Sequence, residues 1–123
     1  MYLNKIEVII LKICTEYRNG ILFVRLKGNL TKNNVNILNR KVTNLIHNAG
    51  IRNVVFNVEK MKDIDFKGIN SLLYNYELVK KNDGNIFICG ENENVRRILR
   101  CNHVFKYIGE INSELCAMNL MKG

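Results

Sequence analysis

Residues that bind metals are scarce and scattered in this 123-residue sequence, which has four cysteines and two histidines. No two cysteines form a C-x-x-C pair, and His47 and His103 do not lie at ligand spacing from a cysteine or from each other. Because protein metal sites need such spacing, we expect no metal and no cofactor. Cys14 and Cys89 fall in apolar, strand-like runs, which predicts that they pack as small buried hydrophobes in a reducing compartment.

Long hydrophobic runs are also missing. A helix that crosses a bilayer needs about 20 apolar residues in a row, and no segment approaches that length. The first 14 residues resemble a signal peptide only superficially, because Lys12 interrupts a short apolar part and no small-residue cleavage site follows. We interpret this stretch as a strand, and we expect a cytoplasmic protein without a membrane anchor.

Proline is absent altogether, whereas asparagine and lysine are abundant. This bias is typical of an AT-rich genome, which inflates the lysine count. The net charge of +8 and the pI near 9.5 suggest a nucleic-acid or acidic protein partner without distinguishing between them. Apolar residues at 47% and charged residues at 24% exclude a disordered or low-complexity chain. The length predicts one domain over residues 1–123.

Runs rich in β-branched and apolar residues alternate with segments of helical periodicity. The runs predict strands at residues 8–14, 20–28, 53–58, 85–90 and 103–109. Asn19-Gly20 is a strong turn signal, so the first two strands should form a hairpin. The strand at 53–58 is apolar on both faces, as in a central strand, and the strand at 103–109 is expected at an edge.

Apolar residues at three- and four-residue steps predict helices at residues 31–49, 69–81, 91–101 and 112–121. The expected N-caps are Thr31 for the first helix, Asn92 or Asn94 for the third, and Asn112 or Ser113 for the last. The resulting order predicts an α/β fold: a mixed β-sheet of about five strands with an N-terminal hairpin, packed by about four helices.

Binding sites in such sheets gather beyond the carboxyl ends of the strands. Residues 63–68, Asp-Ile-Asp-Phe-Lys-Gly, lie at this position, between the central strand and the second helix. The first N–H groups of a helix favour a nearby carboxylate by about 0.3–1 kcal/mol, so Asp65 is expected to be the N-cap. Gly68 would let another backbone approach closely.

The element order and the junction residues resemble the STAS family, which includes the anti-sigma-factor antagonists. Residues 22–31, LFVRLKGNLT, resemble the family's second strand and its Gly-x-Leu-Thr exit into the first helix. Residues 54–69, VVFNVEKMKDIDFKGI, resemble its central strand, loop and Asp-Ser-Ser-Gly-Leu signature. Residues 82–90 and 94–99 match the following strand and helix, so the resemblance covers nearly the whole chain from Gly20 onward.

The resemblance implies a small switch protein that docks onto an anti-sigma factor, often a serine kinase, and frees the sigma factor while unphosphorylated. In that family the serine directly after the signature aspartate is phosphorylated. Here Asp65 and Gly68 match the signature, but Phe66 and Lys67 replace its two serines and carry no hydroxyl. Our leading hypothesis is a non-catalytic STAS-like domain that binds such a regulatory protein or kinase through Asp63, Asp65, Phe66, Lys67 and Gly68, without phosphorylation there.

The sequence leaves the surroundings of this motif open. Phe66 would be a partner anchor if exposed, or part of the core if it packs onto the sheet end. Lys67 would favour an acidic surface, although most single lysines are merely solvated. Ser71 is the nearest hydroxyl, but it falls inside the predicted helix and is a poor phosphate acceptor.

Two other function classes find less support. Nucleic-acid binding would use the cations around the third helix, which are Arg96, Arg97, Arg100, His103 and Lys106. No helix-turn-helix pattern, RNP-type aromatic set or glycine-rich loop accompanies them. An enzyme would use Asp63 and Asp65 as a carboxylate pair for Mg²⁺, but no catalytic partner motif is found.

Overall fold

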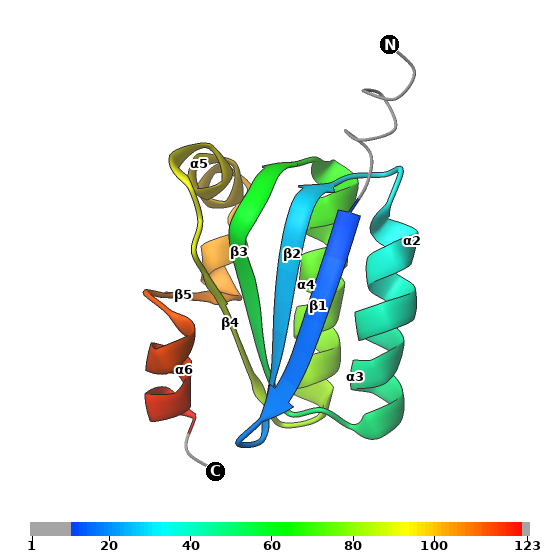
Figure 1. The fold of residues 1–123 in the computed structure, drawn as a ribbon, viewed down its shortest axis with the longest axis vertical. Coiled ribbons are helices and arrows are strands. Elements are labelled where there is room, and N and C mark those ends of the chain that lie inside the picture. The colour runs from blue at the N-terminus through cyan, green and yellow to red at the C-terminus, as the bar shows by residue number, and fades with distance from the viewer. Residues whose placement is uncertain (1–10, 122–123) are drawn as a thin grey trace.

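The computed structural model describes residues 11–121, which build a five-stranded sheet in the order β1-β2-β3-β4-β5 (Figure 1). The strands are β1 Leu11–Arg18, β2 Ile21–Leu30, β3 Asn53–Ile64, β4 Asn85–Cys89 and β5 Gly109–Ile111. β1 pairs with β2 antiparallel, and the remaining pairs are parallel. The mixed sheet with β3 at its centre is therefore confirmed, while residues 8–10 of the first expected strand lie outside the described residues.

The opening hairpin turns on two residues. Asn19 and Gly20 both have positive φ angles, of 55° and 78°, as the type I′ turn requires. Pairing starts directly at Arg18 opposite Ile21. The hairpin is thus confirmed, but β1 continues through residues 15–18, which the sequence had assigned to the connection.

Helices follow each parallel strand. They are α2 Val35–Leu38, α3 Asn44–Ala49, α4 Phe66–Lys81, α5 Glu93–Cys101 and α6 Glu114–Leu120, with a π-helical segment η1 Asn39–Thr43 joining α2 to α3. The first expected helix is therefore one helix interrupted by a π-helical segment. Gly50 ends it in the left-handed conformation with φ 63°, as expected.

Of the caps predicted for the first, third and last helices, two were correct and one was wrong. Asn92 caps α5 by accepting a hydrogen bond from the Val95 N–H at 2.8 Å, and Ser113 caps α6. The N-cap of α2 is Asn34 and not Thr31. Thr31 caps the turn before the helix: its Oγ1 accepts a hydrogen bond from the Asn33 N–H at 3.3 Å, and its carbonyl accepts from the N–H groups of Asn34 and Val35. The helix consequently begins only at Val35.

The strand expected at residues 103–109 was also wrong. His103 adopts a left-handed φ of 62°, and residues Val104–Lys106 form a short 3-10 helix, η2. Val104 and Ile108 are both buried, and the Ile108 N–H donates to the Val104 carbonyl at 2.9 Å. In a strand Lys106 would share the face of Val104 and Ile108, but it is exposed, so this segment is a helical turn and the edge strand starts later, at β5.

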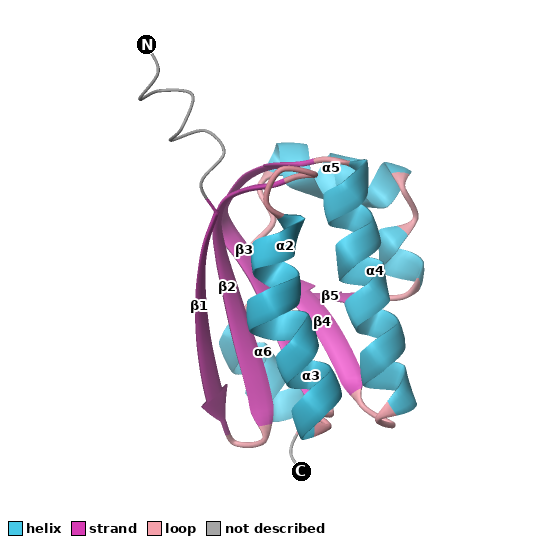
Figure 2. Cartoon of the chain, turned by 90° about the vertical axis from the view of Figure 1, so that its right-hand side faces the viewer, coloured by secondary structure: helices cyan, strands magenta, loops and turns pink. Residues whose placement is uncertain are grey.

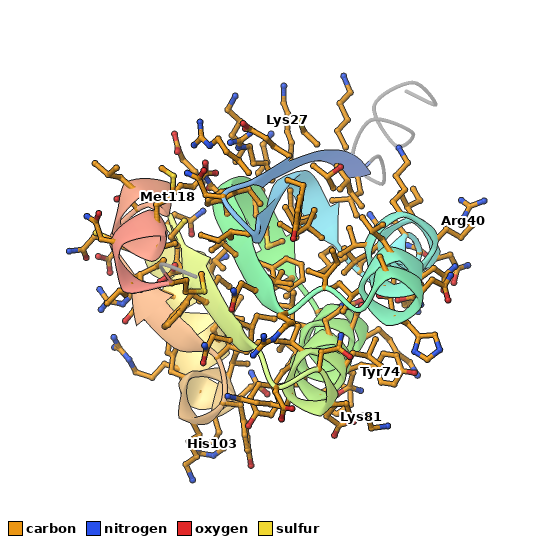
Figure 3. The ribbon with its side chains drawn as sticks, turned by 90° about the horizontal axis from the view of Figure 1, so that it is seen from below. Lys27, Arg40, Tyr74, Lys81, His103 and Met118 are labelled. Atoms are coloured by element: carbon orange, nitrogen blue, oxygen red, sulfur yellow. The ribbon has the colours of Figure 1, made fainter. Side chains whose placement is uncertain are left out.

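The two faces of the sheet are covered unequally. The inner face packs against α2 to α5 in one large apolar cluster that includes Leu22, Phe56, Leu72, Ile88 and Leu99. Among the described residues, α6 alone covers the outer face, over a smaller cluster. Figure 3 places Met118 of α6 and Lys81 of α4 on opposite sides of the sheet, and Figure 2 shows α2, α3 and α4 stacked against it.

The described residues include no helix that is long and apolar enough to span a bilayer. Cys89 is buried, as expected, but Cys14 is exposed. The prediction for Cys14 was wrong because β1 is an edge strand, and its side chain lines an open groove on the outer face.

Candidate functional site

The segment 63–68, here called the helix entrance, lies where β3 ends and α4 begins (Figure 1). Asp65 is the N-cap of α4, as predicted: its Oδ1 accepts a hydrogen bond from the Gly68 N–H at 2.9 Å. Its Oδ2 accepts from the Lys32 N–H at 2.9 Å, and its own N–H donates to the Leu30 carbonyl at 3.2 Å. Asp65 therefore joins α4 to the loop that follows β2.

Gly68 is where the helix entrance touches the end of β2. A Cβ built on Gly68 would lie 2.3 Å from the Leu30 carbonyl oxygen and 2.8 Å from Cγ1 of Ile64. No side chain fits at these distances, so the close backbone approach expected of this glycine is confirmed. Together with Asp65 it fixes the first turn of α4 against two strand ends.

Phe66 is the first residue of α4, and 66% of its surface is exposed. The structure thus decides between the two possibilities that the sequence left open, because the ring does not pack onto the sheet end. Lys67 is exposed beside it. The helix entrance presents an aromatic ring and an ammonium group to solvent from a fixed backbone.

Asp63 is exposed, and its Oδ1 accepts a hydrogen bond from the N–H of Ile64 at 2.9 Å. Both carboxylate oxygens of Asp65 are engaged by backbone N–H groups. The two acids therefore do not converge as a free carboxylate pair. Within residues 11–121, no group of three or more potential metal ligands occurs.

The entrance of α5 lies beside that of α4. Asn92 donates through its side-chain amide to the Met61 carbonyl at 2.9 Å, and Asn94 donates to the Lys62 carbonyl at 3.5 Å. These bonds tie the β4–α5 loop to the last residues of β3. The carboxyl-end edge of the sheet is consequently one continuous surface with the helix entrance at its centre.

The cations of α5, which the sequence offered as a nucleic-acid surface, are partly neutralised. Nε of Arg96 lies 2.8 Å from Oε2 of Glu110, and Arg97 donates to the side chain of Asn94 at 2.9 Å. Arg100, His103 and Lys106 are exposed on the helix and on the turn that follows it. Arg100 lines a pocket with Glu93, Asn94, Arg96 and Arg97, whereas His103 and Lys106 lie outside that lining, so the five cations do not gather at one site.

A carboxyl pair that sequence reasoning missed lies behind α5. Burial, together with a hydrogen bond shared with Glu110, raises the pKa of Glu91 to about 7. The same hydrogen bond, with the Arg96 guanidinium, lowers the pKa of Glu110. Glu91 and Glu110 are separated in sequence and meet only because β4 pairs with β5, so no local pattern could have revealed them.

An ion-pair network on the outer face was also not foreseen. Arg25 of β2 contacts Glu114 of α6 at 2.7 Å and Glu16 of β1 at 2.8 Å, and Asn57 of β3 donates to Glu114 at 2.8 Å. These contacts lower the pKa of Glu114, chiefly through the Arg25 hydrogen bonds. The network fastens the start of α6 to three strands.

Comparison with known proteins agrees with this architecture. The sequence profile of the STAS domain matches residues 12–117. The Anti-sigma F factor antagonist of Paenibacillus polymyxa is 25% identical over 108 residues, which cover 88% of this chain and 92% of that protein.

Solved structures share the fold at low identity. An anti-sigma factor antagonist from Mycobacterium paratuberculosis superposes with a TM-score of 0.82 at 14% identity, covering 93% of this chain and 96% of that one. The unphosphorylated anti-sigma factor antagonist SpoIIAA, a Bacillus protein, gives 0.77 at 15% identity and covers 89% and 96%. With the profile match over most of its length, the chain belongs to the STAS domain family.

Proposed function

We propose that this chain is a regulatory, non-catalytic protein of the cytoplasm that acts as an anti-sigma-factor antagonist and binds its partner through the helix entrance. The observation that carries this proposal is Phe66, an aromatic side chain that is 66% exposed at the first position of α4. Similarity to anti-sigma factor antagonists supports the class of partner, which is an anti-sigma factor or a related kinase.

Exposed aromatic residues on a rigid backbone are favourable anchors for a partner. Burying a phenylalanine side chain contributes about 1.5–3 kcal/mol, and each 1.4 kcal/mol changes a dissociation constant about tenfold. The three backbone contacts of Asp65 hold the ring's backbone in place before binding, which reduces the entropy lost on association. Asp63 and Lys67 lie at the rim, where charges chiefly affect association rates.

The same position argues against phosphorylation as the control. SpoIIAA has been solved in both unphosphorylated and phosphorylated forms. A phosphate at residue 66 would add nearly two negative charges beside Asp65, whereas Phe66 keeps the position neutral. Ser71 is only 8% exposed and lies in the second turn of α4, with its hydroxyl 3.4 Å from the Asn39 side chain. We infer that the binding surface is constitutively available, or that another signal governs it.

The test is calorimetric titration of each purified anti-sigma factor of the host cell with three variants. Phe66→Asp is expected to weaken binding more than about tenfold, because it removes the ring and adds charge. Tyr74→Asp is the matched control, since Tyr74 is 53% exposed on the same helix but away from its entrance. Phe66→Leu should retain most of the affinity.

Phosphorylation is tested separately. Incubation with a partner kinase and ATP should leave the mass of the wild type unchanged, while Phe66→Ser should gain one phosphate at residue 66. Absence of binding to every anti-sigma factor, or equal binding of wild type and Phe66→Asp, would overturn the proposal. If the protein bound duplex nucleic acid at physiological salt and bound no anti-sigma factor, the result would favour nucleic-acid binding through the basic surface of α5.

A further inference from the structure

Three lysines stand side by side across the outer face of the sheet. Lys12 of β1 is the direct register partner of Lys27 of β2, and Lys27 is the direct partner of Lys60 of β3. All three side chains are exposed. Figure 3 shows Lys27 pointing away from the sheet, on the side opposite Tyr74 and Lys81 of α4. We call these three residues the lysine row.

A register shift creates this row. Arg25 pairs with Asn57, so an unbroken ladder would place Glu59 opposite Lys27. The irregularity between Arg25 and Lys27 brings Lys60 into that place. An attractive Lys–Glu pair is thereby replaced by a repulsive Lys–Lys pair. β-Bulges often redirect side chains next to functional sites, and this irregularity places Lys60 beside Lys27.

The described residues do not compensate this repulsion between lysines with an ion pair. Like charges directly opposite each other on neighbouring strands destabilise a sheet. Among residues 11–121, no acidic side chain forms an ion pair with a member of the lysine row. Arg25, on the same strand and face, contacts both Glu16 and Glu114. On the outer face Arg25 is therefore held in ion pairs, whereas the three lysines remain available to an external anion.

The lysine row borders a groove of about 1030 Å³, here called the outer groove, which is lined mostly by the outer face and also by Lys41 of η1. The groove lies where α6 does not cover the sheet, and its lining includes Cys14, Asn57 and Leu115 besides the three lysines. Leu115, in the first turn of α6, is 64% exposed. Cations on one border and an apolar side chain on the other make this surface amphipathic.

We propose that the outer groove binds an extended acidic segment of a partner protein, whose carboxylates face the lysine row while an apolar side chain contacts Leu115. Charge complementarity identifies this occupant. A flat lipid surface does not match a concave groove. The lining acids Glu59 and Glu114 interrupt the cations, which suits carboxylates spaced by uncharged residues better than an unbroken row of phosphates. This surface is separate from the helix entrance, so it provides a second contact beyond the proposed function.

The direct test uses a fluorescent peptide of alternating glutamate and leucine as the probe, with fluorescence anisotropy as the readout. The peptide should bind the full chain, and its counterpart with glutamine for glutamate should not. Raising the salt concentration should weaken binding, because the contacts are exposed charges. The triple variant Lys12→Glu, Lys27→Glu, Lys60→Glu should lower the affinity more than about tenfold.

The matched control is the triple variant Lys80→Glu, Lys81→Glu, Lys106→Glu, which makes the same change in net charge on exposed residues elsewhere. It should change the affinity less than about twofold, as should Phe66→Asp at the helix entrance. An equal loss in both triple variants, or no peptide binding by the wild type, would overturn the proposal. Tighter binding to phosphatidylserine vesicles or duplex DNA than to the peptide would overturn it as well.

Discussion

The inner and outer faces of the sheet differ in the helices and side chains that cover them. The inner face is sealed by four helices over a continuous apolar core, and its strand residues are almost fully buried. Within residues 11–121, the outer face has one short helix, α6, a small apolar cluster beneath it, and charged residues on the surface that α6 leaves open. The same strands supply both faces, because alternate side chains point in opposite directions.

The difference separates stability from recognition. Apolar burial on the inner face supplies most of the folding free energy, since that term grows with the area removed from water. The outer face can therefore hold unpaired cations without losing the fold. Residues that are poorly arranged for stability, such as the lysine row, are consequently the most informative about contacts with other molecules.

The largest effect should come from matched isoleucines on the two faces. Ile88 of β4 lies in the inner cluster and Ile21 of β2 in the outer one, and each is at most 1% exposed. We expect Ile88→Ala to lower the free energy of unfolding by about 4 kcal/mol and Ile21→Ala by about 2 kcal/mol, because the surroundings of Ile21 can collapse more easily. Urea unfolding measures both. Equal losses would contradict the comparison.

A smaller effect should follow from loosening α6. Glu114→Gln removes the charge that Arg25 contacts, and we expect a loss of about 1–2 kcal/mol. Because the pKa of Glu114 is lowered in the fold, its contribution is present above the unfolded pKa and is lost as the pH falls. Hydrogen exchange should quicken in α6 and stay slow in α4. Glu77→Gln, at an exposed position of α4, is the control.

Glu91 should make the free energy of unfolding depend on pH with the opposite sign to Glu114. Its pKa is raised from 4.5 to about 7, so its stabilising contribution is complete below the unfolded pKa and is lost as the pH rises toward 7. Because part of the carboxyl stays in contact with water, we expect the free energy of unfolding to fall by only about 1 kcal/mol as Glu91 deprotonates. Glu91→Gln should flatten this slope between pH 5 and 7, as followed by urea unfolding. An unchanged slope in that variant would remove Glu91 as its cause.

The smallest effect should be a gain in stability at the lysine row. Lys27→Glu converts two repulsive cross-strand pairs into attractive ones, and we expect a stabilisation of about 0.5–1 kcal/mol. The same variant should bind the acidic peptide less tightly, so weaker binding could not be attributed to unfolding. Thermal denaturation measures the effect, with Lys81→Glu as the control variant outside the lysine row. Destabilisation by Lys27→Glu would show that repulsion within the lysine row does not lower the stability of the fold.

Much of the fold could be predicted from the sequence because its signals are local. The Asn19-Gly20 turn, the periodicity of α4 and the cap at Asp65 each depend on residues within a few positions. The strand predicted at residues 103–109 failed because both strands and short helical turns accept apolar runs, and tertiary burial of Val104 and Ile108 decided between them.

The candidate site could be located but not fully described. The residues of the helix entrance were identified from their place after the central strand, whereas the exposure of Phe66 depends on loops distant in sequence. The lysine row depends on the register of three strands and on one irregularity in β2–β3 pairing. No single segment of sequence contains that information.

The backbone at residue 66 has a consequence for the evolution of control. Asp65 already caps the helix and Gly68 already makes room for the neighbouring strand, so a serine in place of Phe66 would need no rearrangement. In the genetic code, every phenylalanine codon is one nucleotide from a serine codon. A phosphorylatable hydroxyl is thus a single point mutation away from this scaffold, and under the proposed function the persistence of the aromatic ring in a lineage would indicate selection for the contact at residue 66.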